Sequence, residues 1–222
     1  KDFTWNVNAN VSYNKNEITE LYNGITEYVA SDTGRMVAVG HPLGEFYLNR
    51  YAGVNPTNGD ALWYTKDGEI TTEYNESDKV MLGKTHEAPW QGGFGTTLSW
   101  QGFSLSAQFT WVADRWMLNN DRVFQESNGL FSAYNQSKRM LYDRWKKPGD
   151  VTDIPRYGVT PQLDSRFLED ASFLRLKNLM LSYTFPQKWL QRTNFLSSAR
   201  IYAQGQNLLT FTSFTGMDPE ST

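Results

Sequence analysis

Apolar and polar residues alternate along several stretches of the chain with the period of two that is typical of β-strands. In Phe3–Tyr13 every odd position is apolar or aromatic, and every even position is Thr, Asn or Ser. Gly93–Trp100 and Phe103–Ala113 show a similar alternation on either side of Gln101-Gly102, which predicts a β-hairpin with a tight turn. Each of these strands is expected to have one apolar and one polar face.

Three further stretches are predicted to be strands, with less regular patterns: Glu45–Val54, Ala171–Phe185 and Ala199–Phe211. Within Ala171–Phe185 the phase of the alternation changes: Leu174 and Leu176 are at even positions, whereas Leu179, Leu181, Tyr183 and Phe185 are at odd positions. A β-bulge near Lys177-Asn178 would keep both halves on one face. The sequence therefore predicts six strands, and no stretch predicts a long helix.

The connections between these strands differ in length. Gln101-Gly102 and Pro186–Ser198 are short, whereas Asn55–Trp90 and Asp114–Asp170 are long. Since short and long connections alternate from Glu45 onward, the long ones are predicted to leave one end of the sheet. Within the first long connection Asp67-Gly68 predicts a local hairpin. Loops of this length usually have a function.

Two interpretations compete for a sheet with one apolar and one polar face. In a soluble sandwich the apolar face is the core, whereas in a transmembrane β-barrel it faces lipid. Eleven residues that rise about 3.3 Å each and tilt by about 45° reach roughly 26 Å, close to the apolar band of about 25 Å in membrane barrels. Aromatic residues near the strand ends suit membrane interfaces, and the polar face is almost free of charge. These features favour an all-β fold, the antiparallel wall of a transmembrane β-barrel.

Composition narrows the function further. The chain has 222 residues, a net charge of −3 and no cysteine. Nucleic acid is not an expected partner because phosphate binding requires a basic surface, and thiolate metal sites are excluded. Six strands cannot close a membrane barrel, since single-chain bacterial barrels start at eight strands. A membrane wall of this size must belong to a larger protein.

Motifs along most of the chain closely resemble the end of SusC/RagA-type TonB-dependent outer-membrane transporters. The motifs are Ser12–Asn16, Gly40–Gly44, Arg144-Trp145, Asp153–Arg156, Phe167–Asn178, Leu181–Tyr183, Ala199–Tyr202, Gly205–Leu208 and Gly216–Glu220. They occur in the order that the family has.

The resemblance implies a 22-stranded barrel in the outer membrane of a Gram-negative bacterium, with an N-terminal plug inside and a SusD-like surface lipoprotein as a lid. Such transporters import oligosaccharides or peptides with energy from the TonB complex, and the barrel wall contacts outer-membrane lipid. Residues 1–222 would be the C-terminal part of the barrel, with the plug domain, its TonB-contacting segment and the final strand absent from this chain. Family topology places the long loops outside the cell.

Catalytic and metal chemistry find little support, and neither an enzyme nor a cofactor is expected. His41 and His86 lack further ligands at metal-site spacing. A cluster of acidic residues in the first long loop lacks the alternate-position pattern of a Ca²⁺ loop and is interpreted as solvated: Asp60, Asp67, Glu69, Glu73, Glu76 and Asp78. Asp164 paired with Glu169 or Asp170 would suit a glycosidase only at a separation of about 5–9.5 Å in a cleft.

Aromatic and arginine side chains of the long loops are the better candidates for ligand contact, because flat rings stack on sugars or peptides and guanidinium groups donate hydrogen bonds. The predicted substrate-binding residues are Trp63, Tyr64, Trp116, Tyr142, Arg144, Trp145, Arg156 and Tyr157. Each could instead serve loop packing. Polar residues of the inner face could hold a plug, which we favour, or line a solute path.

Two other functions are also compatible with the sequence. A secreted all-β carbohydrate-binding module would also carry Trp and Tyr platforms, and a passive porin would also have a polar inner face. The sequence does not separate glycan from peptide as the substrate.

Overall fold

The computed structural model describes residues 3–30, 34–131, 133–191 and 195–221. They form two compact units, and each unit is assembled from three separate stretches of the chain. The first, here called the wall, comprises Lys1–Asn14, Ala88–Asp114 and Ser172–Ser213; the second, the loop unit, comprises Lys15–Glu87, Arg115–Ala171 and Phe214–Thr222.

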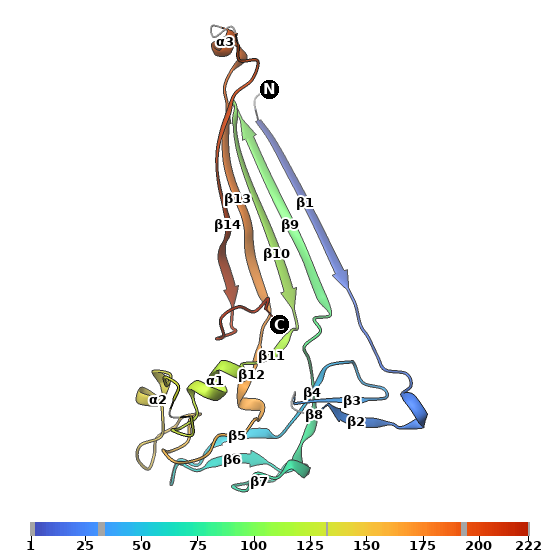
Figure 1. Cartoon of the computed structure of the whole chain (residues 1–222), viewed down its shortest axis with the longest axis vertical. Helices are drawn as coiled ribbons and strands as arrows, with labels where there is room; N and C mark the ends of the chain where they lie inside the picture. The colour runs from blue at the N-terminus through green and yellow to red at the C-terminus, as the bar shows by residue number, and fades with distance from the viewer. Residues whose placement is uncertain (1–2, 31–33, 132, 192–194, 222) are drawn as a thin grey trace. The chain divides into compact units, whose positions relative to one another are not determined.

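The wall is a single antiparallel sheet with the strand order β1-β9-β10-β13-β14 (Figure 1). Its strands are β1 (Phe3–Tyr13), β9 (Trp90–Trp100), β10 (Phe103–Ala113), β13 (Phe173–Thr184) and β14 (Arg200–Thr212), and a short helix, α3 (Gln187–Leu190), follows β13. The strands have 11 to 13 residues, about twice the usual length in soluble proteins. The predicted long strands are confirmed, with small differences at their ends.

The strand register aligns the apolar positions of all five strands in rows. One row joins Trp5, Leu98, Leu105, Leu181 and Ala203, residue against residue. The wall holds no second sheet among its described residues. In the chain Trp5 is therefore 65% exposed. An uncovered apolar face of this extent agrees with a barrel wall and not with a sandwich core.

The hairpin between β9 and β10 turns at Gln101 and Gly102, whose φ angles are 47° and 90°. Two consecutive positive φ angles are typical of a type I′ turn, which matches the twist of the flanking strands. Phe3, Trp100 and Phe103 align at this end of the sheet. The stretches of the loop unit depart from the other end, as the connection lengths predicted.

The predicted bulge lies on β13. Leu176 is opposite Phe109 and Asn178 is opposite Gln108, so Lys177 is the extra residue. The register against β14 shifts at the same place. The bulge keeps the apolar residues before and after it on one face, which explains the change of phase in the sequence.

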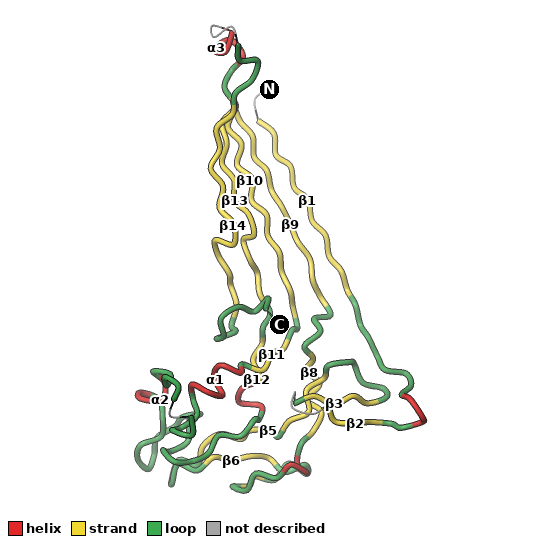
Figure 2. Tube along the Cα trace, viewed as in Figure 1, coloured by secondary structure: helices red, strands yellow, loops and turns green. Residues whose placement is uncertain are grey.

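The loop unit contains short strands, short helices and turns (Figure 2). Its strands are β2 (Glu27–Ala30), β3 (Arg35–Ala38), β4 (Glu45–Leu48), β5 (Arg50–Val54), β6 (Ala61–Tyr64), β7 (Ile70–Thr71), β8 (Val80–Thr85), β11 (Trp116–Leu118) and β12 (Leu168–Asp170). Its helices are η1 (Tyr22–Gly24), η2 (Glu76–Asp78), α1 (Asn120–Gln125), α2 (Arg139–Tyr142) and η3 (Ser165–Phe167). The hairpin predicted at Asp67-Gly68 is present between β6 and β7.

The prediction of one strand over Glu45–Val54 was wrong. The stretch is divided at Asn49 into β4 and β5, which belong to different small sheets. Asn49 is fully buried and donates a hydrogen bond from Nδ2 to the carbonyl of Asn75 at 2.8 Å. Phe46 and Leu48 are also fully buried, in the core of the loop unit. Their alternation therefore reflects burial in a small core and not a face of the wall.

The α-helices of the described residues have four to six residues each. None of them is long and apolar enough to cross a membrane.

Candidate ligand-binding surface

Four of the predicted site residues meet in the loop unit beside the turn Asn55–Asp60. Trp145 donates from Nε1 to the carbonyl of Pro56 at 3.2 Å. Arg156 donates from its backbone N–H to the carbonyl of Gly59 at 2.8 Å and from Nε to Asp60 Oδ1 at 2.9 Å. We call Arg144, Trp145, Arg156 and Tyr157 the Trp145 cluster.

The backbone of Gly59 lies against both Trp145 and Arg156. Its φ angle is +78°, and a Cβ atom placed there would lie 2.4 Å from the ring of Trp145 and 2.9 Å from Arg156 Cβ. Glycine is required at Gly59 both because L residues rarely adopt this φ and because the indole ring lies against its backbone. The ring of Trp145 therefore has a fixed orientation.

Arg144 and Tyr157, the other members of the cluster, are held by a cation–π contact, a β-bridge and hydrogen bonds. The guanidinium carbon of Arg144 lies 5.4 Å from the centre of the Tyr157 ring, within the range of a cation–π contact. Arg144 forms a parallel β-bridge with Ile154. Asn128 donates from Nδ2 to the carbonyls of Arg156 and Val159, at 2.6 and 2.9 Å, and so holds the Tyr157 loop.

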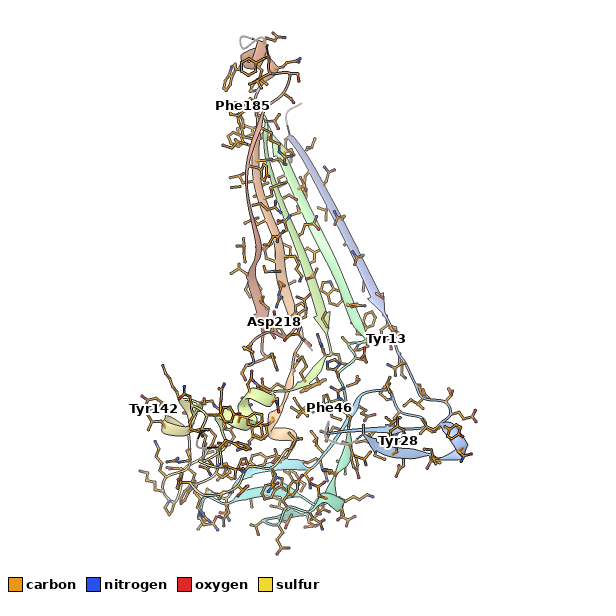
Figure 3. All side chains as sticks on the ribbon, viewed as in Figure 1. Tyr13, Tyr28, Phe46, Tyr142, Phe185 and Asp218 are labelled. Carbon is orange, nitrogen blue, oxygen red and sulfur yellow. The ribbon has the colours of Figure 1, made fainter. Side chains whose placement is uncertain are left out.

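A cavity of about 600 Å³ lies next to the cluster, in the segment Tyr142–Asp153. Tyr142 and Arg144 were predicted as site residues, and both line it. Tyr142 lies at the end of α2 (Figure 3) and is 70% exposed. Other charged residues of the lining were not predicted from the sequence, among them Lys146, Lys147 and Asp150. The signal that could have found them is the turn Pro148-Gly149 directly after the two lysines.

Three predicted site residues lie apart from the Trp145 cluster. Trp63 is 5% exposed and donates from Nε1 to Asp164 Oδ2 at 2.8 Å, so it belongs to the core of the loop unit. Tyr64 is half-buried under the guanidinium of Arg50.

Trp116 is the third of these residues, and it packs against the core formed by Phe46, Leu48 and Leu168. The ammonium of Lys84 lies 3.4 Å from the centre of the Trp116 ring. Burial lowers the pKa of Lys84. The structure therefore assigns packing contacts to Trp63, Tyr64 and Trp116.

The carboxylates that could have suggested catalysis have structural partners. Asp164 accepts hydrogen bonds from Trp63 and from the backbone of Arg166 at 2.9 Å, and burial raises its pKa. Glu169 accepts from Arg122 Nη1 at 2.7 Å and from the backbone of Thr215 at 2.7 Å. Burial acts to raise the pKa of Glu169, but these bonds outweigh it and hold the pKa below the ordinary value.

The histidines also have partners in the loop unit. His41 Nδ1 lies 2.9 Å from the buried carboxylate of Glu45, and His86 Nε2 lies 3.3 Å from Arg115 Nη2. Burial and the charges of Arg115 and Arg35 lower the pKa of His86. The described residues contain no cluster of three or more side chains suited to a metal ion.

The polar face of the wall carries a row of side-chain amides. Asn8, Gly95, Gln108, Asn178 and Gln206 are aligned across the five strands. A Cβ atom at Gly95 would lie 2.9 Å from both Asn8 Oδ1 and Gln108 Nε2, so these amides lean over the glycine. The row offers neutral donors and acceptors together.

Comparison with known proteins gives similarity over the whole chain. No model of a protein family matches it. TonB-dependent receptor P3 of Formosa agariphila is 29% identical over 100% of this chain, which corresponds to 24% of the receptor. TonB-dependent receptor SusC of Bacteroides thetaiotaomicron is 26% identical over 99% of the chain and 22% of the receptor.

Solved structures show the same similarity in three dimensions. The RagAB peptide transporter superposes with a TM-score of 0.92 at 38% identity, over 99% of this chain and 25% of the transporter chain. The RagAB peptide importer in its closed-closed state gives a TM-score of 0.90 at 39% identity, with the same coverage. The chain spans about a quarter of the length of the relatives that it matches.

Proposed function

Because this chain belongs to the SusC/RagA type of TonB-dependent receptors, we propose that it is part of an active importer of oligosaccharides or peptides in the outer membrane of a Gram-negative bacterium. The uncovered apolar face of the five-stranded wall carries this proposal. Rows of apolar side chains that continue from strand to strand are stabilised by contact with acyl chains.

Residues 1–222 would form the C-terminal part of the barrel, with a plug domain supplied by a region outside this chain. The amide row at Asn8, Gln108 and Asn178 supports this arrangement. Neutral donors and acceptors suit the polar surface of a protein domain within the barrel. The TonB complex would act through the same part of the receptor that supplies the plug domain.

The loop unit would take up the ligand together with a SusD-like lipoprotein. The Trp145 cluster supports ligand binding, since it presents a guanidinium and aromatic rings held by backbone bonds. The two solved structures named above are a peptide transporter and a peptide importer, which favours a peptide, whereas the similarity to SusC keeps an oligosaccharide as the second candidate. The relatives are receptors and transporters, and we propose no catalytic activity.

Uptake in cells with and without TonB tests the import function. A strain that lacks the receptor gene would be complemented with the wild-type gene, and the uptake of labelled peptides and oligosaccharides would be measured. We expect uptake to require TonB while binding of the ligand at the cell surface does not. Uptake that continues without TonB would contradict active import and indicate a passive pore.

A further inference from the structure

The cavity in segment Tyr142–Asp153 is built by a loop that closes on itself. The backbone N–H groups of Lys146 and Lys147 both donate to Asp150 Oδ2 at 3.0 Å. The hydroxyl of Thr152 donates to the carbonyl of Asp143 across the loop. The cavity is open to solvent on one side, and its volume of about 600 Å³ lies within the range of about 300–1,000 Å³ for small-molecule sites.

The loop is anchored to its surroundings at both ends. Arg139 Nη2 donates to both carboxylate oxygens of Asp153 at 2.7 Å. The backbone N–H of Gly149 and the indole of Trp145 both donate to the carbonyl of Pro56, at 2.8 and 3.2 Å. A cavity held in this way loses little conformational freedom when a ligand binds.

The carboxylates that line the cavity already have partners. Asp150 accepts from two backbone N–H groups, and Asp153 is paired with Arg139. Asp143 Oδ2 lies 3.6 Å from Arg139 Nε. Few strong acceptors are therefore left for a cationic ligand.

The cationic side chains that line the cavity have hydrogen-bond donors that are not used among the described residues. The ammonium of Lys146 donates to one acceptor, the carbonyl of Tyr142 at 3.2 Å. Within the part of the chain that the structure describes, the guanidinium of Arg144 and the ammonium of Lys147 make no hydrogen bond and no ion pair within 4 Å. The cavity thus offers charged donors in surplus over acceptors.

From this imbalance we propose that the cavity binds a carboxylate group of the imported ligand, and this rests on the import function proposed above. The carboxylate accepts hydrogen bonds from Arg144 and Lys147, because charge-assisted bonds of this kind are the strongest that these groups form. The exposed side chains of Tyr142 and Val151 contact the apolar part of the ligand. A neutral oligosaccharide lacks the charge to pair with these cations.

Binding to the intact receptor in detergent tests this site. The probes are a pentapeptide with a free C-terminus, the same peptide with an amidated C-terminus, an oligogalacturonate and a neutral oligogalactoside. We expect the carboxylate probes to bind about tenfold more tightly than their neutral counterparts. The difference between the two carboxylate probes identifies the source of the group, and a preference for either supports the proposal.

Substitutions test which side chains bind the carboxylate group. Lys147→Gln is expected to weaken binding of the carboxylate probe several-fold and to leave the neutral probe unaffected. Arg144→Gln is expected to weaken binding of the carboxylate probe more than binding of the neutral probe. Lys66→Gln is the matched control, since Lys66 is an exposed lysine of the loop unit outside the cavity. Raising the salt concentration should reduce the preference for the carboxylate.

Equal affinities for charged and neutral probes would overturn the carboxylate site. The same holds if Lys147→Gln, a substitution of an exposed side chain, leaves the preference intact. TonB-dependent uptake that persists in either case would show that the import function stands without this site. Loss of TonB dependence in the wild type would instead overturn the import function itself.

Discussion

Glu126 is a buried charged residue of the loop unit, and its side chain is 1% exposed. It accepts from Arg122 at 3.1 Å and from Arg139 at 2.6 Å, and Arg122 continues the network to Glu169. Glu169 in turn accepts a hydrogen bond from the backbone N–H of Thr215. The network therefore joins α1, α2 and β12 to the segment that follows β14.

The contact between Glu169 and Thr215 is expected to depend on pH. The pKa of Glu169 in the folded protein is lower than its ordinary value of 4.5, so its ionised form stabilises the contact. This stabilisation is present above pH 4.5 and is lost as the pH falls through the lowered pKa. Hydrogen exchange of the Thr215 amide, corrected for its intrinsic rate, measures the loss.

Glu169→Gln is the matched variant for this measurement. It removes the charge and keeps the size, so its Thr215 amide should be weakly protected at every pH. If protection in the wild type is unchanged down to about pH 3, well below the ordinary pKa of a glutamate, or if the variant behaves as the wild type does, the carboxylate does not hold this segment.

Gly59 permits a separate prediction about the Trp145 cluster. In Gly59→Ala the new methyl group collides with the Trp145 ring, and overpacking of this kind costs about 1–3 kcal/mol. Gly68→Ala is the control, because Gly68 has a similar φ of +95° but no atom within 4 Å of the place that a Cβ would occupy. Hydrogen exchange at the Trp145 and Arg156 amides should show the difference in local opening free energy, and equal effects would contradict the packing of Trp145 on Gly59.

How far the sequence predicts the site depends on the residue. Arg144, Trp145, Arg156 and Tyr157 were predicted from their chemistry and meet in the structure. Trp63 was chosen for the same chemistry, yet it is buried against Asp164. A loop with several aromatic residues must bury some of them to form a core, and no local pattern in the sequence identifies which.

At the scale of the element, the bulge at Lys177 shows what the alternation of residues does predict. Because side chains alternate between faces, a change of phase within one strand requires an extra residue. The structure has it between Leu176 and Asn178. The short strands β4 and β5 were not separated in the prediction, since apolar residues of a small core alternate in the same way.

Deletion of Lys177 tests the function of the bulge. Because Lys177 is the extra residue, its removal leaves Leu176, Leu179 and Leu181 in regular alternation on the apolar face. We expect the deletion variant to keep the heat-modifiable migration in SDS gels that marks a folded barrel, as Lys177→Gln should. Loss of this migration in the deletion variant alone would contradict the assignment of Lys177 as the extra residue of the register.

At the scale of the whole molecule, the wall has two edges. Among the described residues β1 pairs with β9 alone and β14 with β13 alone. In lipid each unpaired backbone group of an edge costs several kcal/mol. The five strands therefore need strands from elsewhere to be stable in a membrane.

Expression of these 222 residues alone should consequently give no SDS-resistant form. Co-expression with the remainder of the receptor should restore it, because the edges of β1 and β14 then pair. The measurement is the gel shift of outer-membrane fractions. Stable membrane insertion of the chain alone would show that it closes its own edges, for example by self-association.

The stretches of the loop unit all depart from the end of the sheet opposite the Gln101-Gly102 turn. Residues gained or lost there do not shift the register of any wall strand. Insertions and deletions in these stretches can therefore accumulate during evolution without new selection for assembly of the wall. Exchanging these stretches between paralogues should transfer the ligand preference of one receptor to another.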